Sequence, residues 1–179
     1  MDFRISFSGR SHNYIELEIT AAMDAMRNAV PLTQGYHLRS FENQIKRYIG
    51  VEHAFAISNA TAGLELAAQL CQFKPGDEVI IPTHTFTSTA YPFAKAGARI
   101  VWADIDLSTR VVTETTIEPC ITPNTRVIVV SHLYGFGVDM PPIMDLAKKH
   151  GLLVVEDAAQ VIGVMIGDHM AGSFGDFSV

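Results

Sequence analysis

An acidic residue, Asp157, stands at the end of an apolar run with the character of a buried strand, Leu152 to Asp157. Open α/β sheets bind ligands at the carboxyl ends of their strands, and a buried carboxylate is costly unless it is paired. Three partners are open for Asp157: a cationic ligand such as a protonated pyridine nitrogen, a distant Lys or Arg, or a helix that it caps. Gln160 lies three residues further on, close enough to contact the same ligand.

A second candidate site lies at Ser58 to Gly63, where a predicted strand meets a predicted helix. Small and hydroxylic residues at a helix N-terminus leave backbone N–H groups free, which suits a phosphate group. Asn59 and Thr61 are also good helix caps, so phosphate binding and a purely structural role both stay open.

Aromatic and histidine side chains follow other predicted strands. Phe86 could stack on a flat ring or belong to the core, and His84 could contact a substrate or cap the next helix. His132 and Tyr134 follow a further strand, so they are expected at the same edge of the sheet.

Short apolar strands alternate with helical stretches after about residue 50, a pattern typical of an α/β fold with a mostly parallel sheet. Several strands are near-continuous Val/Ile runs, which predicts helices on both faces. The predicted strands are Ala54–Ser58, Glu78–Pro82, Arg99–Ala103, Arg126–Ser131 and Leu152–Asp157, with Gly172–Val179 as a candidate sixth. The predicted helices between them are Thr61–Gln72, Thr87–Ala96 and Pro141–His150.

The first fifty residues differ from the rest of the chain. Apolar residues recur at helical spacing in Tyr14–Ala29 and again in Leu38–Ile49, with a loop at Pro31–Gly35 between them. The sequence therefore predicts two domains: a helical arm over 1–50 and an α/β domain over 51–179.

Composition excludes several functions for this chain of 179 residues, 48% of them apolar. A net charge of −6 offers no basic surface for nucleic acid. No apolar run approaches the roughly 20 residues of a membrane span, and the N-terminus lacks the apolar stretch of a signal peptide. Cys71 and Cys120 have no metal or redox spacing and are expected as buried or half-buried thiols in a cytoplasmic protein.

Other catalytic patterns are missing from the sequence. There is no G-x-S-x-G motif for a serine hydrolase and no G-x-G-x-x-G motif for a dinucleotide. No cluster of His, Cys and Asp has the spacing of a metal site.

Taken together and in this order, the motifs resemble the DegT/DnrJ/EryC1/StrS family of sugar aminotransferases. The resemblance covers nearly the whole chain from about Gly35 onward. The matching stretches are Ser-Asn-Ala-Thr-Ala-Gly-Leu (58–64), Pro-Gly-Asp-Glu-Val-Ile-Ile-Pro-Thr-His-Thr-Phe (75–86), Asp-Ile-Asp (104–106), His-Leu-Tyr-Gly (132–135), Val-Glu-Asp-Ala-Ala-Gln (155–160) and Gly-Ser-Phe-Gly-Asp-Phe-Ser (172–178).

The resemblance implies the large domain of the aspartate-aminotransferase fold, pyridoxal 5′-phosphate (PLP) as cofactor and a homodimer or higher homo-oligomer. It implies transfer of an amino group, from glutamate, to a keto group of a nucleotide-linked sugar. Ala60 and Thr61 would bind the cofactor phosphate, Phe86 would stack on the ring, and Gln160 would contact the ring's 3′ oxygen. Asp157 would pair with the ring nitrogen. His84 and Tyr36 are the expected substrate contacts.

The sequence departs from the family pattern at its C-terminal end. Relatives place a Ser-Phe-x-x-x-Lys segment after the point where this sequence stops, and its lysine forms the Schiff base with the cofactor. We therefore expect an incomplete large domain without the C-terminal small domain, and a chain that is inactive by itself. A dehydratase of the same family, with His in place of that lysine, and a non-catalytic dimerisation or regulatory product are the alternatives.

Overall fold

The computed structural model describes residues 13–179, and the chain divides into two compact units, residues 1–44 and 45–179. The first unit contains α1 (Glu16–Asn28) and most of α2 (Tyr36–Ile49). Both helices were predicted, and their bounds differ from the predicted ones by at most two residues. Neither helix buries a side chain. The predicted domain boundary at residue 50 remains a prediction.

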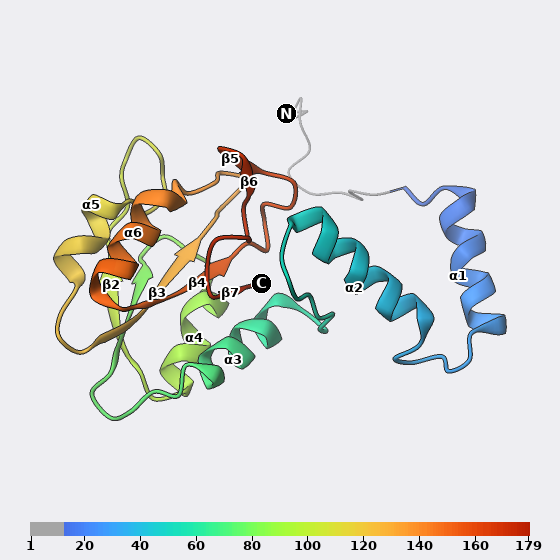
Figure 1. Ribbon diagram of the computed structural model, residues 1–179, viewed down its shortest axis with the longest axis horizontal. Coiled ribbons are helices and arrows are strands. Elements are labelled where there is room, and N and C mark those ends of the chain that lie inside the picture. The colour runs from blue at the N-terminus through green and yellow to red at the C-terminus, as the bar shows by residue number, and fades with distance from the viewer. Residues whose placement is uncertain (1–12) are drawn as a thin grey trace, which may run out of the picture. The chain divides into compact units, whose positions relative to one another are not determined.

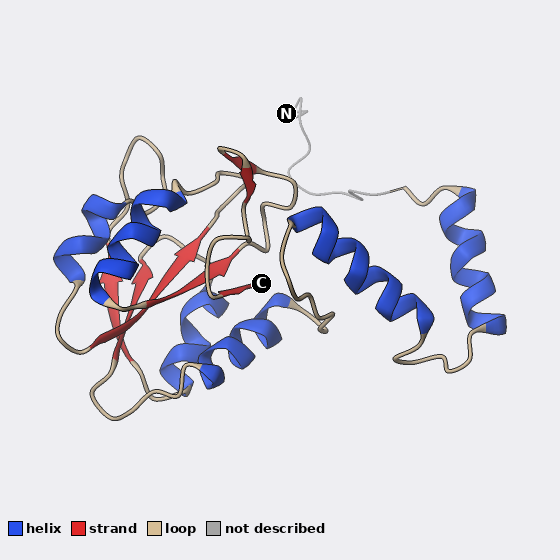
Figure 2. Ribbon diagram, viewed as in Figure 1, coloured by secondary structure: helices blue, strands red, loops and turns tan. Residues whose placement is uncertain are grey.

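The second unit is built on a five-stranded sheet in which every pairing is parallel (Figure 2). The strand order is β2-β1-β3-β4-β7. A separate antiparallel pair, β5 (Met165–Ile166) with β6 (His169–Met170), was not predicted. The sheet strands are β1 (Glu78–Pro82), β2 (Arg99–Ala103), β3 (Thr125–Ser131), β4 (Leu153–Asp157) and β7 (Phe177–Ser178).

Helices cover both faces of the sheet, as the Val/Ile runs predicted (Figure 1). On one face lie α3 (Ala60–Leu70) and α4 (Thr87–Lys95). On the other lie the short α5 (Glu114–Ile117), the 3₁₀ turn η1 (Glu118–Cys120) and α6 (Met140–His150). The predicted α/β class with a mostly parallel sheet is confirmed.

Strand β4 shows why its sequence is apolar almost throughout. Successive side chains of a strand point to opposite faces. Val154 packs in the cluster that includes residues of α6, and Val155 packs in the cluster that includes residues of α3 and α4. Both valines are fully buried, so both faces of the strand are covered at these two positions.

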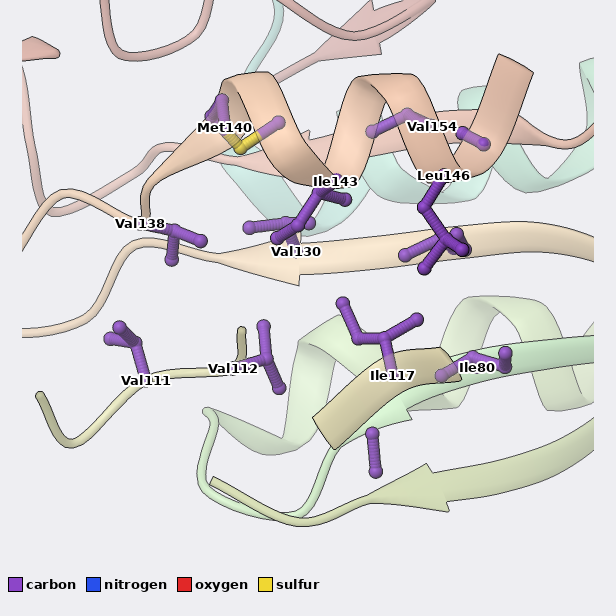
Figure 3. Packing of buried hydrophobic residues seen from close by; sticks show 13 residues of the cluster. Ile80, Val111, Val112, Ile117, Val130, Val138, Met140, Ile143, Leu146 and Val154 are labelled. Atoms are coloured by element: carbon purple, nitrogen blue, oxygen red, sulfur yellow. The ribbon is translucent and has the colours of Figure 1, made fainter. Parts of the chain in front are cut away.

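Figure 3 shows the packing of α6 on the sheet, with Ile143 and Leu146 directed towards the strand residues Val130 and Ile80. Ile143 is fully buried. We expect Ile143→Ala to lower the free energy of unfolding by about 3 kcal/mol, because it removes buried methyl groups and leaves a cavity. Denaturant titration measures the loss. Ile162→Ala, at a side chain that is 73% exposed, is the control and should cost little.

The prediction of a strand at Ala54–Ser58 was wrong. Strands pair only when they lie about 4.8 Å apart, and the nearest edge of the sheet, β7, is separated from this segment. A groove of about 740 Å³ lies there, lined by Phe55 and Ile57 from the segment, by Ser178 of β7 and by Val179 after it. The segment therefore has the alternating apolar pattern of a strand but no neighbouring strand in the described chain with which to pair.

Both cysteines are free and half-buried, as predicted. Burial, with a smaller contribution from the charge of Asp176, raises the pKa of Cys71 to about 11. Within residues 13–179, no helix has the length and apolar character needed to cross a membrane.

Candidate functional site

A cavity of about 170 Å³ lies at the carboxyl ends of β3 and β4, and we call it the strand-end cavity. It brings together residues from four separate parts of the chain. They include all five that the sequence singled out for cofactor binding. The lining residues are Ala60, Thr61, Phe86, Ser88, Ser131, His132, Leu133, Asp157, Ala159 and Gln160.

Asp157 is the last residue of β4 and is only 7% exposed. Its Oδ2 accepts a hydrogen bond of 2.7 Å from the Thr89 hydroxyl, and its Oδ1 accepts one of 3.3 Å from the N–H of Ala159. Among the residues that the structure describes, no Lys, Arg or His forms an ion pair with it. The sequence left three kinds of partner possible for Asp157, and the described residues do not provide one of them, a distant Lys or Arg.

The N-terminus of α3 contributes hydrogen-bond donors to the same cavity. Asn59 is the N-cap, and its side chain accepts a 2.9 Å bond from the N–H of Ala62. The N–H groups of Ala60 and Thr61 have no acceptor within residues 13–179. The first N–H groups of a helix carry the positive end of its dipole, so these two donors favour an anion in the cavity.

Phe86 and Gln160 complete the lining. Phe86 is 65% exposed, so it is not a core residue, and its ring is available to cover a flat ligand. The side-chain oxygen of Gln160 accepts a 2.8 Å bond from the N–H of Tyr134. Because that backbone group can only donate, the Gln160 amide keeps its NH₂ free as a donor.

His132 lines the cavity, but both of its ring nitrogens are already engaged. Nδ1 accepts a 3.0 Å bond from the N–H of Val138, so the ring hydrogen of the neutral tautomer lies on Nε2. Nε2 then donates to Glu156 Oε2 at 3.0 Å. His132 is 1% exposed, so it supports the cavity wall and has no free nitrogen to offer a ligand.

Glu156 is fully buried beside Asp157. Besides His132, it accepts bonds of 2.7–2.9 Å from the N–H groups of Gly172, Phe174 and Gly175. Burial alone would raise the pKa of Glu156, but the bonds from His132 and the three N–H groups together lower it. Glu156 thus holds the segment that leads to β7.

Two residues of this region, Thr89 and Glu156, were not singled out from the sequence. Thr89 lies one helical turn after Phe86, so its place on α4 was a usable signal. Glu156 precedes Asp157, and an acidic residue inside an otherwise apolar strand was the signal for a buried network.

The two predicted substrate contacts do not line the strand-end cavity. His84 Nδ1 lies 3.1 Å from the carbonyl oxygen of Arg110, and its ring lies 5.8 Å from that of Tyr134. Tyr36 begins α2 in the first unit and is 72% exposed. A role for either in substrate binding stays a prediction.

Several known proteins are similar to this chain. A model of the DegT/DnrJ/EryC1/StrS aminotransferase family matches residues 13–179. UDP-N-acetyl-3-dehydro-alpha-D-glucosamine 3-aminotransferase from Acidithiobacillus ferrooxidans is 41% identical over 89% of this chain, which covers 43% of that relative.

Solved structures give the same picture. An aminotransferase from Psychrobacter cryohalolentis superposes with a TM-score of 0.88 at 33% identity, over 97% of this chain and 44% of that one. NtdA from Bacillus subtilis, solved with bound cofactor PMP, has a TM-score of 0.77 at 30% identity, over 84% of this chain and 35% of its own. The chain thus spans less than half the length of these relatives.

Proposed function

Because the chain belongs to the DegT/DnrJ/EryC1/StrS aminotransferase family, we propose that its strand-end cavity binds PLP and the amino form of this cofactor, PMP. One observation carries the proposal. Asp157 is buried and has no ion pair within residues 13–179, and it shares a cavity with two N–H groups that have no acceptor in the same part of the chain. A ligand with a protonated ring nitrogen and a phosphate matches both needs.

The residues fit the parts of this cofactor one by one. The N–H groups of Ala60 and Thr61 would bind the phosphate, and Phe86 would cover the ring. The free NH₂ of Gln160 would donate to the ring oxygen. Asp157 would hold a proton on the ring nitrogen. When bound, the cofactor supplies an electron sink for moving an amino group, and Asp157 maintains it by keeping the nitrogen charged.

We propose amino transfer between glutamate and a keto group of a nucleotide-linked sugar as the reaction. The relative from Acidithiobacillus ferrooxidans, named for an aminotransferase that acts on a UDP-linked keto sugar, supports this substrate class. Because the chain is expected to be inactive by itself, the test uses the chain extended with the C-terminal part of a relative that carries the lysine. Supplied with PLP and a keto nucleotide sugar, this extended chain should form 2-oxoglutarate from glutamate. Turnover that is independent of PLP would contradict the proposal.

The proposed phosphate contact can be tested separately from the contacts to the ring of the cofactor. Ala60 is the first residue of α3, and Asn59 before it has the extended backbone that a following proline requires. Ala60→Pro therefore removes one N–H while keeping the helix. We expect PMP to bind at least about tenfold more weakly, because a bond to a charged group is lost.

Calorimetric titration with PMP and with pyridoxamine, which lacks the phosphate, measures this effect. Pyridoxamine should bind the wild-type chain and Ala60→Pro equally. Equal loss for both ligands would mean that the proline disturbs the cavity as a whole, and the phosphate assignment would then be wrong.

We also propose that the protein assembles as a homodimer, which the resemblance implied. Helix α1 supports this, because large apolar side chains on it are solvent-exposed. They include Leu17 and Met26, which are 75% and 69% exposed. Sedimentation velocity is the measurement, and Leu17→Glu should shift a dimer towards monomer. A monomer at all accessible concentrations would contradict the proposal.

A further inference from the structure

We propose that Thr89 is a positioning residue for Asp157, and that Thr85 in turn orients Thr89. Thr89 would hold one carboxylate oxygen of Asp157 so that the other faces the ring nitrogen of the cofactor. This inference rests on the proposed cofactor and assigns a role to residues that contact no ligand themselves.

The hydroxyl of Thr89 is completely buried. It donates to Asp157 Oδ2 at 2.7 Å, across 68 positions of sequence. Its backbone N–H donates to the carbonyl oxygen of Phe86 at 2.9 Å, which fixes the first turn of α4. The backbone of Thr89 is therefore fixed by α4, and its hydroxyl donates one hydrogen bond to the last residue of β4.

The direction of this hydrogen bond is set by Asp157, whose carboxylate can only accept. The Thr85 hydroxyl donates to Thr89 Oγ1 at 2.8 Å. A hydroxyl has one hydrogen, so Thr89, which gives its hydrogen to Asp157, can only accept from Thr85, and this second bond fixes the orientation of the Thr89 hydroxyl. The two threonines thus form a relay, in which Thr85 donates to Thr89 and Thr89 donates to the carboxylate of Asp157. A hydrogen bond to a carboxylate is stronger than one between neutral groups.

The relay leaves the two oxygens of Asp157 unequal. Oδ2 is held at 2.7 Å by Thr89, whereas Oδ1 has only the long 3.3 Å contact to the N–H of Ala159. Oδ1 therefore retains capacity to accept from a charged N–H in the strand-end cavity. Without Thr89 the carboxylate could rotate, and neither oxygen would be aimed in advance. We infer that the relay preorganises the partner of the ring nitrogen.

The test compares two ligands in the full 179-residue chain. One is PMP and the other is its carbocyclic analogue, in which C–H replaces the ring nitrogen. The ratio of the two dissociation constants isolates the interaction between Asp157 and the nitrogen. A residue that merely packs α4 would weaken both ligands equally and leave this ratio unchanged.

The variants are Thr89→Val, which keeps the shape and removes the donor, and Thr89→Ser, which keeps the donor. We expect the wild-type preference for PMP to fall about tenfold in Thr89→Val and to be restored within about twofold in Thr89→Ser. Thr85→Val should lower the preference less. Thr115→Val, at an exposed position of α5, is the matched control and should bind both ligands like the wild type.

An unchanged ratio in a folded Thr89→Val, or no recovery in Thr89→Ser, would overturn the role of Thr89. Failure of the proposed function gives a different result. In that case the wild-type chain itself would not prefer PMP over the carbocyclic analogue, or would bind neither, and the inference would fall with it.

Discussion

Asp157→Asn is expected to weaken PMP binding by about 2–5 kcal/mol, or at least 30-fold, since it removes the charged partner of a desolvated ring nitrogen. The same change should leave the unliganded chain as stable as the wild type, or make it more stable. In the free protein the buried carboxylate has no ion pair with a Lys, Arg or His of residues 13–179. Removing an unpaired buried charge lowers a cost.

Two measurements check this prediction: calorimetric titration with PMP and denaturant unfolding without ligand. Asp145→Asn, at an exposed position of α6, is the matched control and should change neither. A variant that loses stability without losing PMP affinity would show that Asp157 is a structural residue, and the proposed cofactor site would have to be abandoned.

Glu156→Ala is expected to have the largest effect on stability, lowering the free energy of unfolding by about 3–5 kcal/mol. The carboxylate is fully buried and accepts four hydrogen bonds, one from His132 and three from backbone N–H groups. Its removal leaves these donors buried without an acceptor, each at a desolvation cost. Glu156→Gln should also destabilise, because an amide NH₂ would then face N–H donors.

The acid sensitivity of the fold should change with the same residue. The folded-state pKa of Glu156 lies below its ordinary value of 4.5. The ionised group therefore contributes stability that is fully present above pH 4.5 and is lost as the pH falls through the lower folded-state pKa. Below pH 4.5, the free energy of unfolding should fall less steeply in Glu156→Gln than in the wild type.

Denaturant titrations at several pH values test both statements. Glu52→Gln is the control, because the side chain of Glu52 is 86% exposed, and it should preserve the wild-type stability and pH dependence. If Glu156→Gln were as stable as the wild type at neutral pH, the hydrogen-bonded network around Glu156 would contribute nothing, contrary to this prediction.

The sequence predicted the sheet well where the strands are buried on both faces. The bounds of β1, which is buried along its whole length between helices on each side of the sheet, are those predicted. The bounds of β2, a partly exposed strand at the edge of the sheet, are also those predicted. Ala54–Ser58 shows the limit of that reasoning. Alternation indicates which face of a segment is apolar, but a strand also needs a neighbour at pairing distance, and a groove lies there instead.

The candidate site was predicted residue by residue only where a motif marked it. Ala60, Thr61, Phe86, Asp157 and Gln160 do line one cavity. Thr89 escaped because its partner is 68 positions away, and a threonine in a helix has no distinctive spacing. The role of Glu156 was not predicted because three of the N–H groups that donate to it lie in the loop 172–175, and no local sequence pattern determines the path of that loop.

Because successive side chains of β4 point to opposite faces, its two adjacent carboxylates cannot take each other's place. Glu156 faces the loop at 172–175 and Asp157 faces Thr89 on α4, so the two acids lie on opposite sides of one strand. A slip of β4 by a single residue would exchange them and leave both networks unsatisfied. A strand misaligned by one residue would therefore lose the bonds from the 172–175 loop to Glu156 and the bond from Thr89 to Asp157 at the same time.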